Sequence, residues 1–316
     1  MRDYPNPLIE QRADPFVLRH SDGYYYFTAS VPEYDRLELR RARSINELSQ
    51  ASPTVVWQKP QQGPMSHLIW APELHFINSK WYLYFAAAHS PEIADGLFQH
   101  RMFALECSAA NPLTGDWVEK GRIYTHIDSF SLDATHFEHR GKHYYLWAQK
   151  DPAIHGNSNL YLAEMANPWT LKGQPVMLSQ PELPWETVGF SVNEGPAVIT
   201  HGQKIFISYS ASATDENYCL GLLWADIDSD ITDATQWHKL GQPLFRTSVK
   251  NRQFGPGHNS FTLDEQGQDL LVYHARNYTE IEGDPLYDPN RHTRIKSLEW
   301  DGEGMPVLGE PPADNR

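Results

Sequence analysis

A short hairpin pattern recurs five times along the 316-residue chain, and this repetition limits the fold more than any other feature. In each repeat a short apolar strand, a turn and an aromatic or β-branched strand follow one another, as at 16–18, 21–23 and 24–27. The second strands begin at Tyr24, Trp81, His143, Ile205 and Asp269, at intervals of 57, 62, 62 and 64 residues. A regular period of this length, with about four strands in each unit, is typical of a β-propeller.

The sequence therefore predicts an all-β protein, a single five-bladed β-propeller domain over residues 1–316. Aromatic residues make up 12% of the chain, and such residues favour strands. A pair of β-sandwiches is the alternative for five hairpins. A sandwich does not require a fixed repeat, so the regular interval favours the propeller.

The charge balance excludes two classes of partner. The chain carries 40 acidic and 26 basic residues, a formal net charge of −14. Nucleic acid and anionic membranes both need a basic surface, so we expect neither as a partner. No apolar run is long enough to span a membrane.

The cysteines and the N-terminus bear on the compartment. Cys107 and Cys219 are far apart in the sequence and predict two buried free thiols, with neither a disulfide framework nor a thiolate metal site. The N-terminal residues contain no apolar signal segment. On these grounds we expect a cytoplasmic protein, or a secreted one if a leader has been removed.

A propeller directs the start of each blade's first strand toward one shared funnel on its axis. The five repeats offer there, in order, Asp14, Glu73, Asp133, Glu194 and His258. Acids beside proline or glycine also occur in ordinary turns, so no single one is decisive. Taken together at equivalent positions of the repeat, Asp14, Asp133 and Glu194 indicate three converging carboxylates, while the role of Glu73 stays open.

Converging carboxylates suggest acid–base chemistry. Like charges gathered in one funnel raise each other's pKa, so one group can act as general acid while another stays ionised as general base. Glycoside hydrolysis needs such a pair, and an inverting enzyme separates the two by roughly 6.5–9.5 Å to admit a water. Opposite walls of a propeller funnel suit that separation.

Five segments at these positions resemble glycoside hydrolase family 43 over essentially the whole chain. They read RADPFVLRHSDGYYYFTAS, IWAPELHFINSKWYLYFAA, SLDATHFEHRGKHYYLWAQ, NEGPAVITHGQKIFISYSAS and GPGHNSF. The resemblance implies an inverting mechanism with Asp14 as general base and Glu194 as general acid. Asp133 would be the third acid, which orients Glu194 and keeps its pKa high. The family often has Asp-Pro at this last position, where this chain has Asp133-Ala134.

Other residues are candidates for binding. Trp70 at the entry of the second blade could stack on a sugar, Phe27 closes the first aromatic strand, and the resemblance implies that Arg294 lies near the base and the sugar hydroxyls. Each could equally be a structural residue. In similar family members the histidine that matches His258 lies beside a hydrated calcium or sodium ion, so a structural ion is expected there. One imidazole is a thin ligand set for such a cation, and the chemistry requires no cofactor.

The segment YDRLELRRA at 34–42 resembles members that act on arabinose. We therefore expect an α-L-arabinofuranosidase that removes terminal residues from arabinan or arabino-oligosaccharides. A β-D-xylosidase acting on xylo-oligosaccharides is the next candidate, and an endo-arabinanase is a third. A sugar-binding propeller without activity is the alternative from another class. Such binders often repeat one site in every blade, whereas these five blades differ.

Overall fold

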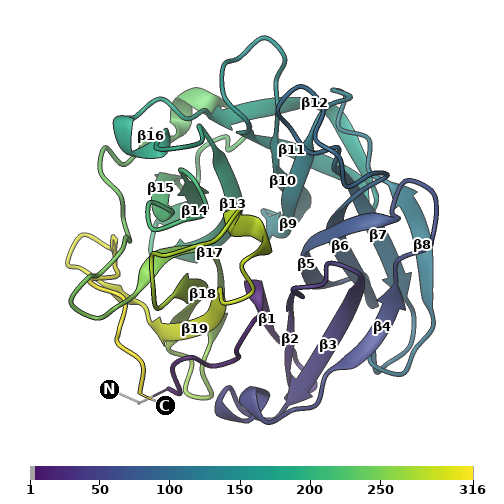
Figure 1. The fold of residues 1–316 in the computed structure, drawn as a ribbon. Coiled ribbons are helices and arrows are strands. Elements are labelled where there is room, and N and C mark those ends of the chain that lie inside the picture. Colours follow the sequence, from purple (N-terminus) through teal and green to yellow (C-terminus); the bar gives the residue numbers. More distant parts are fainter. Residues whose placement is uncertain (1–3, 316) are drawn as a thin grey trace.

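The computed structural model describes residues 4–315, which contain five antiparallel sheets arranged as a five-bladed β-propeller (Figure 1). Blade one contains β1 (Ala13–Arg19), β2 (Tyr25–Ser30), β3 (Arg36–Ala42) and β4 (Thr54–Gln58); blade two contains β5 (His67–Ile77), β6 (Lys80–Ala88), β7 (Arg101–Cys107) and β8 (Trp117–Arg122). Blade three contains β9 (Ser131–His139), β10 (Lys142–Gln149), β11 (Asn159–Asn167) and β12 (Thr170–Ser179); blade four contains β13 (Asn193–His201), β14 (Lys204–Ala211), β15 (Cys219–Asp226) and β16 (His238–Lys239). The predicted fold class is thus confirmed, and the expected domain over 1–316 includes four residues outside the described range.

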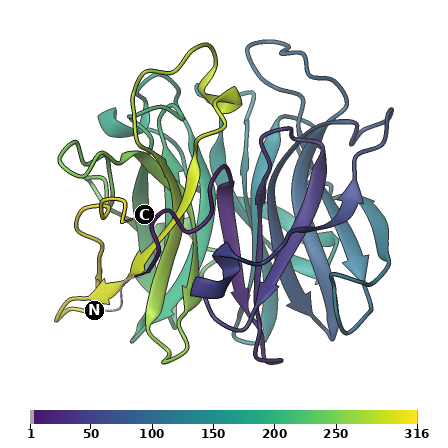
Figure 2. The ribbon, with the colours of Figure 1, turned by 60° about the horizontal axis from the view of Figure 1, so that its bottom comes forward.

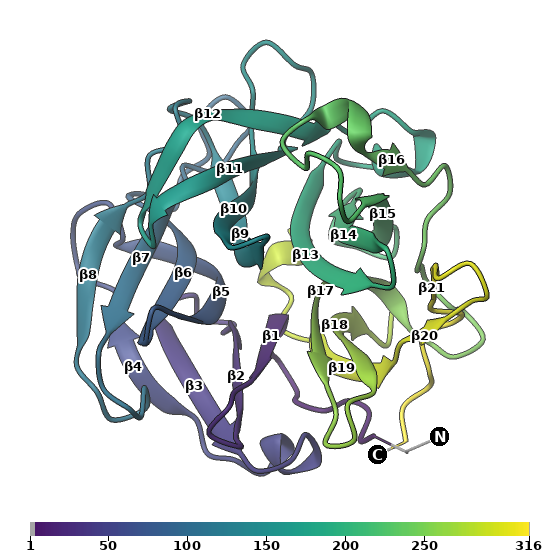
Figure 3. The same ribbon diagram turned by 180° about the vertical axis from the view of Figure 1, so that it is seen from behind.

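Blade five is shorter than the others. It has three strands, β17 (Phe254–Leu263), β18 (Asp269–Arg276) and β19 (His292–Ser297), and a separate hairpin of β20 (Glu299–Trp300) and β21 (Pro306–Val307) follows. The segment that precedes β1 takes up part of the free edge, because Ile9 forms an antiparallel bridge with Thr293 of β19. The amide of Asn315 also donates to the carbonyl of Asn6 at 2.9 Å. Both ends of the described chain therefore meet beside blade five, as Figures 1 and 3 show.

Four 3-10 turns lie in the connections, namely η1 (Asn46–Ser49), η2 (Pro184–Glu186), η3 (Ala234–Gln236) and η4 (Pro285–Tyr287). The side view in Figure 2 places the loop that carries η4, between β18 and β19, beyond one end of the strands. Among residues 4–315, no helix is long and apolar enough to cross a membrane.

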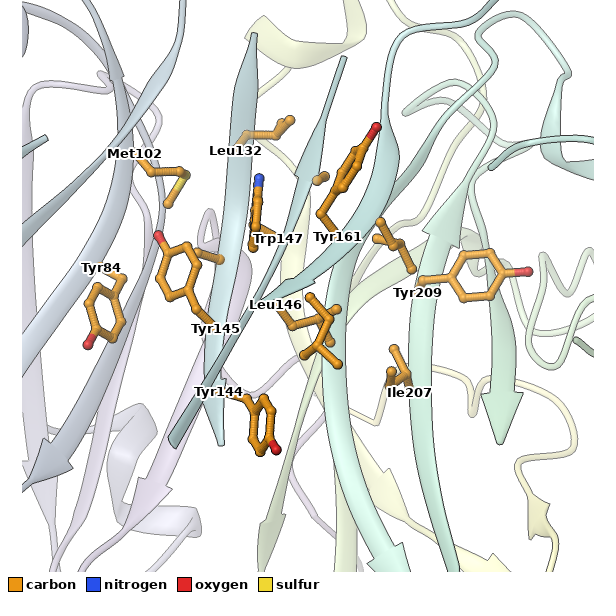
Figure 4. Packing of buried hydrophobic residues seen from close by; sticks show 14 of the residues in the cluster. Tyr84, Met102, Leu132, Tyr144, Tyr145, Leu146, Trp147, Tyr161, Ile207 and Tyr209 are labelled. Atoms are coloured by element: carbon orange, nitrogen blue, oxygen red, sulfur yellow. The ribbon is translucent and has the colours of Figure 1, made fainter. Parts of the chain in front are cut away.

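The core lies between neighbouring blades. In Figure 4, Tyr145 of β10 lies on the side of Tyr84 in blade two, while Leu146 lies on the opposite face of the strand, on the side of Ile207 in blade four. Alternate residues of a strand point to opposite faces, and the second strand of each blade is buried on both. This explains why the aromatic runs visible in the sequence all fall on the second strands. Both cysteines are buried and free, as predicted.

The innermost strand of every blade has the same irregularity. Its pairing with the second strand shifts register around one residue in the left-handed region, which is Asp14 (φ 54°), Ala71 (φ 47°), Asp133 (φ 58°), Gly195 (φ 54°) and His258 (φ 44°) in blade order. Residues other than glycine rarely adopt such a φ, and β-bulges of this kind re-aim side chains next to active sites. Three of these five residues, Asp14, Asp133 and His258, line one pocket at the axis.

This register corrects the predicted equivalence of the acids. Asp14, Asp133 and His258 do occupy the same position of their blades, but Glu194 lies one residue before the bulge and Glu73 lies two residues after it. The physical reason is that a bulge changes the direction of successive side chains, so position along the repeat alone does not say which acids face the funnel.

Candidate active site

Three acids from three blades line one pocket at the axis. Asp14 of β1, Asp133 of β9 and Glu194 of β13 all contribute to its wall, together with His258 of β17 and Arg291. The sequence brought forward all of these except Arg291. The rest of the wall combines apolar side chains, among them Trp70 and Phe190, with polar ones such as Asn157 and Thr214.

Asp14 is held by contacts on both carboxylate oxygens. Ser30 of the neighbouring strand donates to its Oδ2 at 2.5 Å, while its Oδ1 lies 3.2 Å from Nδ1 of His258 and 3.6 Å from a guanidinium nitrogen of Arg291. The backbone N–H of Asp14 donates to Nδ1 of His274 at 3.0 Å. This position is therefore rigid in both its side chain and its backbone.

These neighbours keep Asp14 ionised. Burial by itself would raise the pKa of its carboxyl, but His258 and Arg291 outweigh burial and hold that pKa far below its usual range. Burial also lowers the pKa of His258, while the charges of Asp14 and Glu73 oppose that shift, so the charge of this imidazole depends on pH. Arg291 is then the lasting positive charge beside Asp14, because a guanidinium does not lose its proton in proteins.

Asp133 lies next to the bulge of blade four. Its Oδ2 accepts a hydrogen bond from the backbone N–H of Gly195 at 3.0 Å. Gly195 suits this contact because it has a positive φ and because a Cβ there would lie 3.0 Å from the ring of His258. Burial raises the pKa of Asp133 well above its usual value, and the charges of Glu194 and Asp14 raise it further.

Glu194 accepts a hydrogen bond from the hydroxyl of Tyr218 at 2.8 Å. Burial raises the pKa of Glu194 to about 7, and the negative charge of Asp14 adds to this effect, while the Tyr218 bond and Arg291 oppose it. The ring of Tyr218 stacks on His274, with ring centroids 5.6 Å apart. Of these three acids, Asp14 is thus ionised at neutral pH, while Asp133 and Glu194 retain their protons more strongly than usual.

The predicted substrate contacts divide into one that lines the pocket and two that do not. Trp70 is in the pocket wall and stacks on His100 with ring centroids 3.7 Å apart. Phe27 is 1% exposed and packs in the cluster between blades one and five, on the same face of β2 as Tyr25. The interpretation of Phe27 as a substrate contact is therefore wrong, because the side chain is sealed in the core.

The prediction that Arg294 lies near the base and the sugar hydroxyls is also wrong. It is completely buried, donates to the carbonyl of Ala275 and to Asn277, and forms an ion pair with Asp314. Arg291, three residues earlier, is the arginine beside Asp14. Residues an odd number apart along an extended chain point to opposite sides, which separates the two arginines. Nothing in the local sequence at 291–294 distinguishes Arg291 from Arg294 as the residue that faces the pocket.

Glu73 lies outside the pocket wall. Its carboxyl is 2.8 Å from Nε2 of His75 and is buried. Burial raises the pKa of Glu73 to about 8 and lowers the pKa of His75 to about 3, so the pair is a hydrogen bond between neutral groups at pH 7. The fourth acid is therefore a structural neighbour of the site.

The surroundings of His258 do not form a metal cage. Its Nδ1 faces Asp14 and, at 3.7 Å, Asp133. Within residues 4–315, no group of three or more His, Cys, Asp or Glu side chains is placed to hold a metal ion. Calcium prefers six to eight oxygen ligands, which one imidazole does not supply. The calcium or sodium ion expected near His258 stays a prediction from the family resemblance.

The family model described as glycosyl hydrolases family 43 matches residues 4–306. The chain belongs to this family. As a member of family 43, it is 55% identical over 312 residues, 98% of its length, to an extracellular exo-α-(1→5)-L-arabinofuranosidase of Streptomyces avermitilis. It is 51% identical over 99% of its length to α-L-arabinofuranosidase 43 of Humicola insolens.

This family 43 chain spans 64% of the length of each of those two relatives. A crystal structure of an α-L-arabinofuranosidase from Lactobacillus brevis superposes with a TM-score of 0.98 at 56% identity, covering 99% of this chain and 98% of that one. The Streptomyces avermitilis relative is described as extracellular, so the comparisons do not support the expectation that this chain is cytoplasmic.

Proposed function

We propose that this chain is an inverting glycoside hydrolase that releases terminal α-L-arabinofuranosyl residues from arabinan or arabino-oligosaccharides. One observation carries the proposal. Asp14 and Glu194 line the same pocket, and their surroundings shift their pKa values in opposite directions. Two carboxyl groups whose pKa values differ in this way are suited to the roles of base and acid.

Glu194 is the general acid in this mechanism. Its raised pKa keeps the proton available near neutral pH, and this proton passes to the glycosidic oxygen as the bond from that oxygen to the anomeric carbon breaks. The hydroxyl of Tyr218 orients the carboxyl. Asp133 adds a second buried carboxyl whose electrostatic coupling to Glu194 favours proton retention by the pair.

Asp14 is the general base. It accepts a proton from a water molecule, whose oxygen forms the new bond to the anomeric carbon on the face opposite the leaving group. Arg291 keeps the carboxylate ionised, and Ser30 fixes its direction. The chemical step uses only side chains of this chain, and its products are free arabinose with inverted configuration and the shortened chain.

The choice of sugar is supported by the relatives. Three proteins that match 89–99% of this chain at 51–55% identity are named arabinofuranosidases. Arabinofuranose and xylose are similar in size, so a β-D-xyloside is the appropriate competing substrate. Arabinose-containing oligosaccharide or polysaccharide is accordingly the proposed partner of the pocket.

The test is hydrolysis of 4-nitrophenyl α-L-arabinofuranoside, 4-nitrophenyl β-D-xyloside and α-1,5-linked arabino-oligosaccharides by the full chain. We expect turnover of the arabinosides and release of single arabinose units. Proton NMR of the first product should show the anomer opposite to that of the substrate. Turnover of the xyloside alone would overturn the sugar assignment, and retention of configuration would overturn the mechanism.

A further inference from the structure

An exposed phenylalanine stands on the loop that leads into the strand of Glu194. Phe190 lines the catalytic pocket, yet 52% of its surface is exposed. A large apolar side chain that is half exposed and also part of a pocket wall is suited to contact a ligand that enters the pocket. The position is four residues before Glu194, in the connection between β12 and β13.

This loop is held from both sides. On the blade-four side, Val188 accepts a hydrogen bond from the amide of Ala213 at 2.9 Å and donates to Ser212 Oγ at 3.0 Å. On the blade-three side, the carbonyl of Ser191 accepts from the amide of Asn157 at 2.7 Å. Phe190 is therefore presented to the pocket by backbone that is fixed before and after it.

Gly189 adds a tight contact to the same loop. It has a φ of +75°, and a Cβ at this position would lie 2.8 Å from the Cβ of Ala213. Only glycine allows both the positive φ and this close approach. The loop thus packs directly on the neighbouring connection, and the ring of Phe190 stays at the mouth of the pocket.

The position of the acid defines which part of a substrate reaches this ring. A general acid donates its proton to the oxygen of the leaving group, so the leaving group lies on the side of Glu194. Phe190 precedes Glu194 by four residues on the segment that leads into β13, and both side chains line the pocket. Asn157 and Thr214, which also line the pocket, belong to the two segments that flank the Phe190 loop, and their amide and hydroxyl groups suit ring hydroxyls.

From this arrangement we infer that Phe190 is a specificity-determining residue that binds the sugar ring of the leaving group through its apolar C–H face. The inference rests on the proposed function and adds the chemistry of the group on the far side of the cleaved bond. The occupant is a second sugar unit, since aromatic rings cover the faces of sugars while flanking polar groups bind their hydroxyls.

The experiment compares Phe190→Ala with the wild-type chain on three arabinofuranosides that differ only in the leaving group. These are α-1,5-linked arabinobiose, 4-nitrophenyl α-L-arabinofuranoside and methyl α-L-arabinofuranoside. We expect kcat/KM on arabinobiose to fall by roughly 3–10-fold, the size of one lost aromatic contact. On the methyl glycoside, whose leaving group has no ring, the change should stay below about twofold. Phe190→Tyr should restore the activity on arabinobiose.

Phe76→Ala is the matched control, because Phe76 is 41% exposed and does not line the pocket. It should leave all three rates unchanged. An equal loss on all three substrates, or no loss on arabinobiose, would overturn the inference. A loss confined to the nitrophenyl substrate would show that Phe190 contacts aryl leaving groups and not sugars, which would also overturn the inference. A wild-type chain inactive on every arabinofuranoside would instead refute the proposed function, and the inference with it.

Discussion

A guanidinium nitrogen of Arg291 lies 3.6 Å from Oδ1 of Asp14, although the two residues come from opposite ends of the chain. The same guanidinium donates to the hydroxyl of Tyr34 at 2.8 Å, and Tyr34 in turn donates to the carbonyl of Leu286. Arg291 is only 4% exposed. Its charge is thus fixed beside the proposed base by a contact that joins blade one to the loop before β19.

Replacing this arginine should change the pH dependence of the activity. In Arg291→Met, burial of Asp14 is no longer offset by a permanent positive charge, so the pKa of Asp14 rises. Because a base must be ionised, kcat/KM of the variant should fall on the acidic side at a pH where the wild type still keeps its full value. The measurement is kcat/KM on 4-nitrophenyl α-L-arabinofuranoside between about pH 3 and about pH 9.

Arg294→Met serves as the matched control, since Arg294 is a buried arginine outside the pocket. It should lower the free energy of unfolding, because it leaves Asp314 without its ion-pair partner, and keep the acidic limb in place. If both variants shift the limb equally, Arg291 has no particular influence on Asp14.

Glu194→Gln removes the proposed acid and keeps the shape of the side chain. On an arabino-oligosaccharide, kcat should fall by about 10²–10⁴-fold, because the leaving oxygen then departs without a proton. On the 4-nitrophenyl glycoside, whose leaving group is stable as an anion, the loss should be much smaller. The alkaline limb, which in the wild type reflects a pKa of about 7, should disappear from the variant's profile.

Glu164→Gln controls for the loss of a carboxylate elsewhere. Glu164 pairs with Lys142 and Lys172 on the outside of blade three, so its replacement should not alter either rate. Full activity of Glu194→Gln on the oligosaccharide would remove Glu194 from the mechanism.

Glu73 should make the stability of the protein depend on pH. Its folded-state pKa of about 8 lies above the ordinary value of 4.5, so the folded state binds the proton more tightly than the unfolded state. Stability from this group is therefore complete below about pH 4.5 and is lost as pH rises toward 8. Between pH 5 and pH 8 the free energy of unfolding should therefore decrease less in Glu73→Gln than in the wild type.

Urea unfolding at the two pH values measures this difference. Because other buried carboxyls contribute to the slope in both proteins, the comparison between variant and wild type isolates Glu73. An identical pH dependence in both would mean that folding does not raise the pKa of Glu73.

Arg276 should position the loop that carries Arg291. Its guanidinium donates to the carbonyls of Thr214 and Pro285 and to Asp288, so it joins two connections that line the pocket. In Arg276→Met these bonds are lost, and we expect unfolding to require about 2–4 kcal/mol less. The factor by which KM for arabinobiose increases should be several times the factor by which kcat decreases. A lower melting temperature with unchanged KM would show a purely structural role, and Arg276→Lys should recover part of the affinity.

Much of this molecule was accessible from the sequence because its signals are local. Each hairpin carries its own turn and its own aromatic strand, so five repeats could be counted without knowledge of their packing. The acids Asp14, Asp133 and Glu194 were found because they stand beside those strands in fragments that resemble a family. The catalytic assignment itself still rests on the experiments above.

The tertiary structure decided what depends on the direction of side chains. Arg291 and Arg294 are nearly adjacent in sequence, but only one faces the axis, and Phe27 looks like a binding aromatic until its strand packs against blade five. The bulge in each inner strand separates Glu194 and Glu73 from the position of Asp14. A bulge reverses which residues face the funnel, and composition carries no record of it. The sequence alone determined the repeats and the chemical groups, while the meeting of distant strands determined which groups share a site.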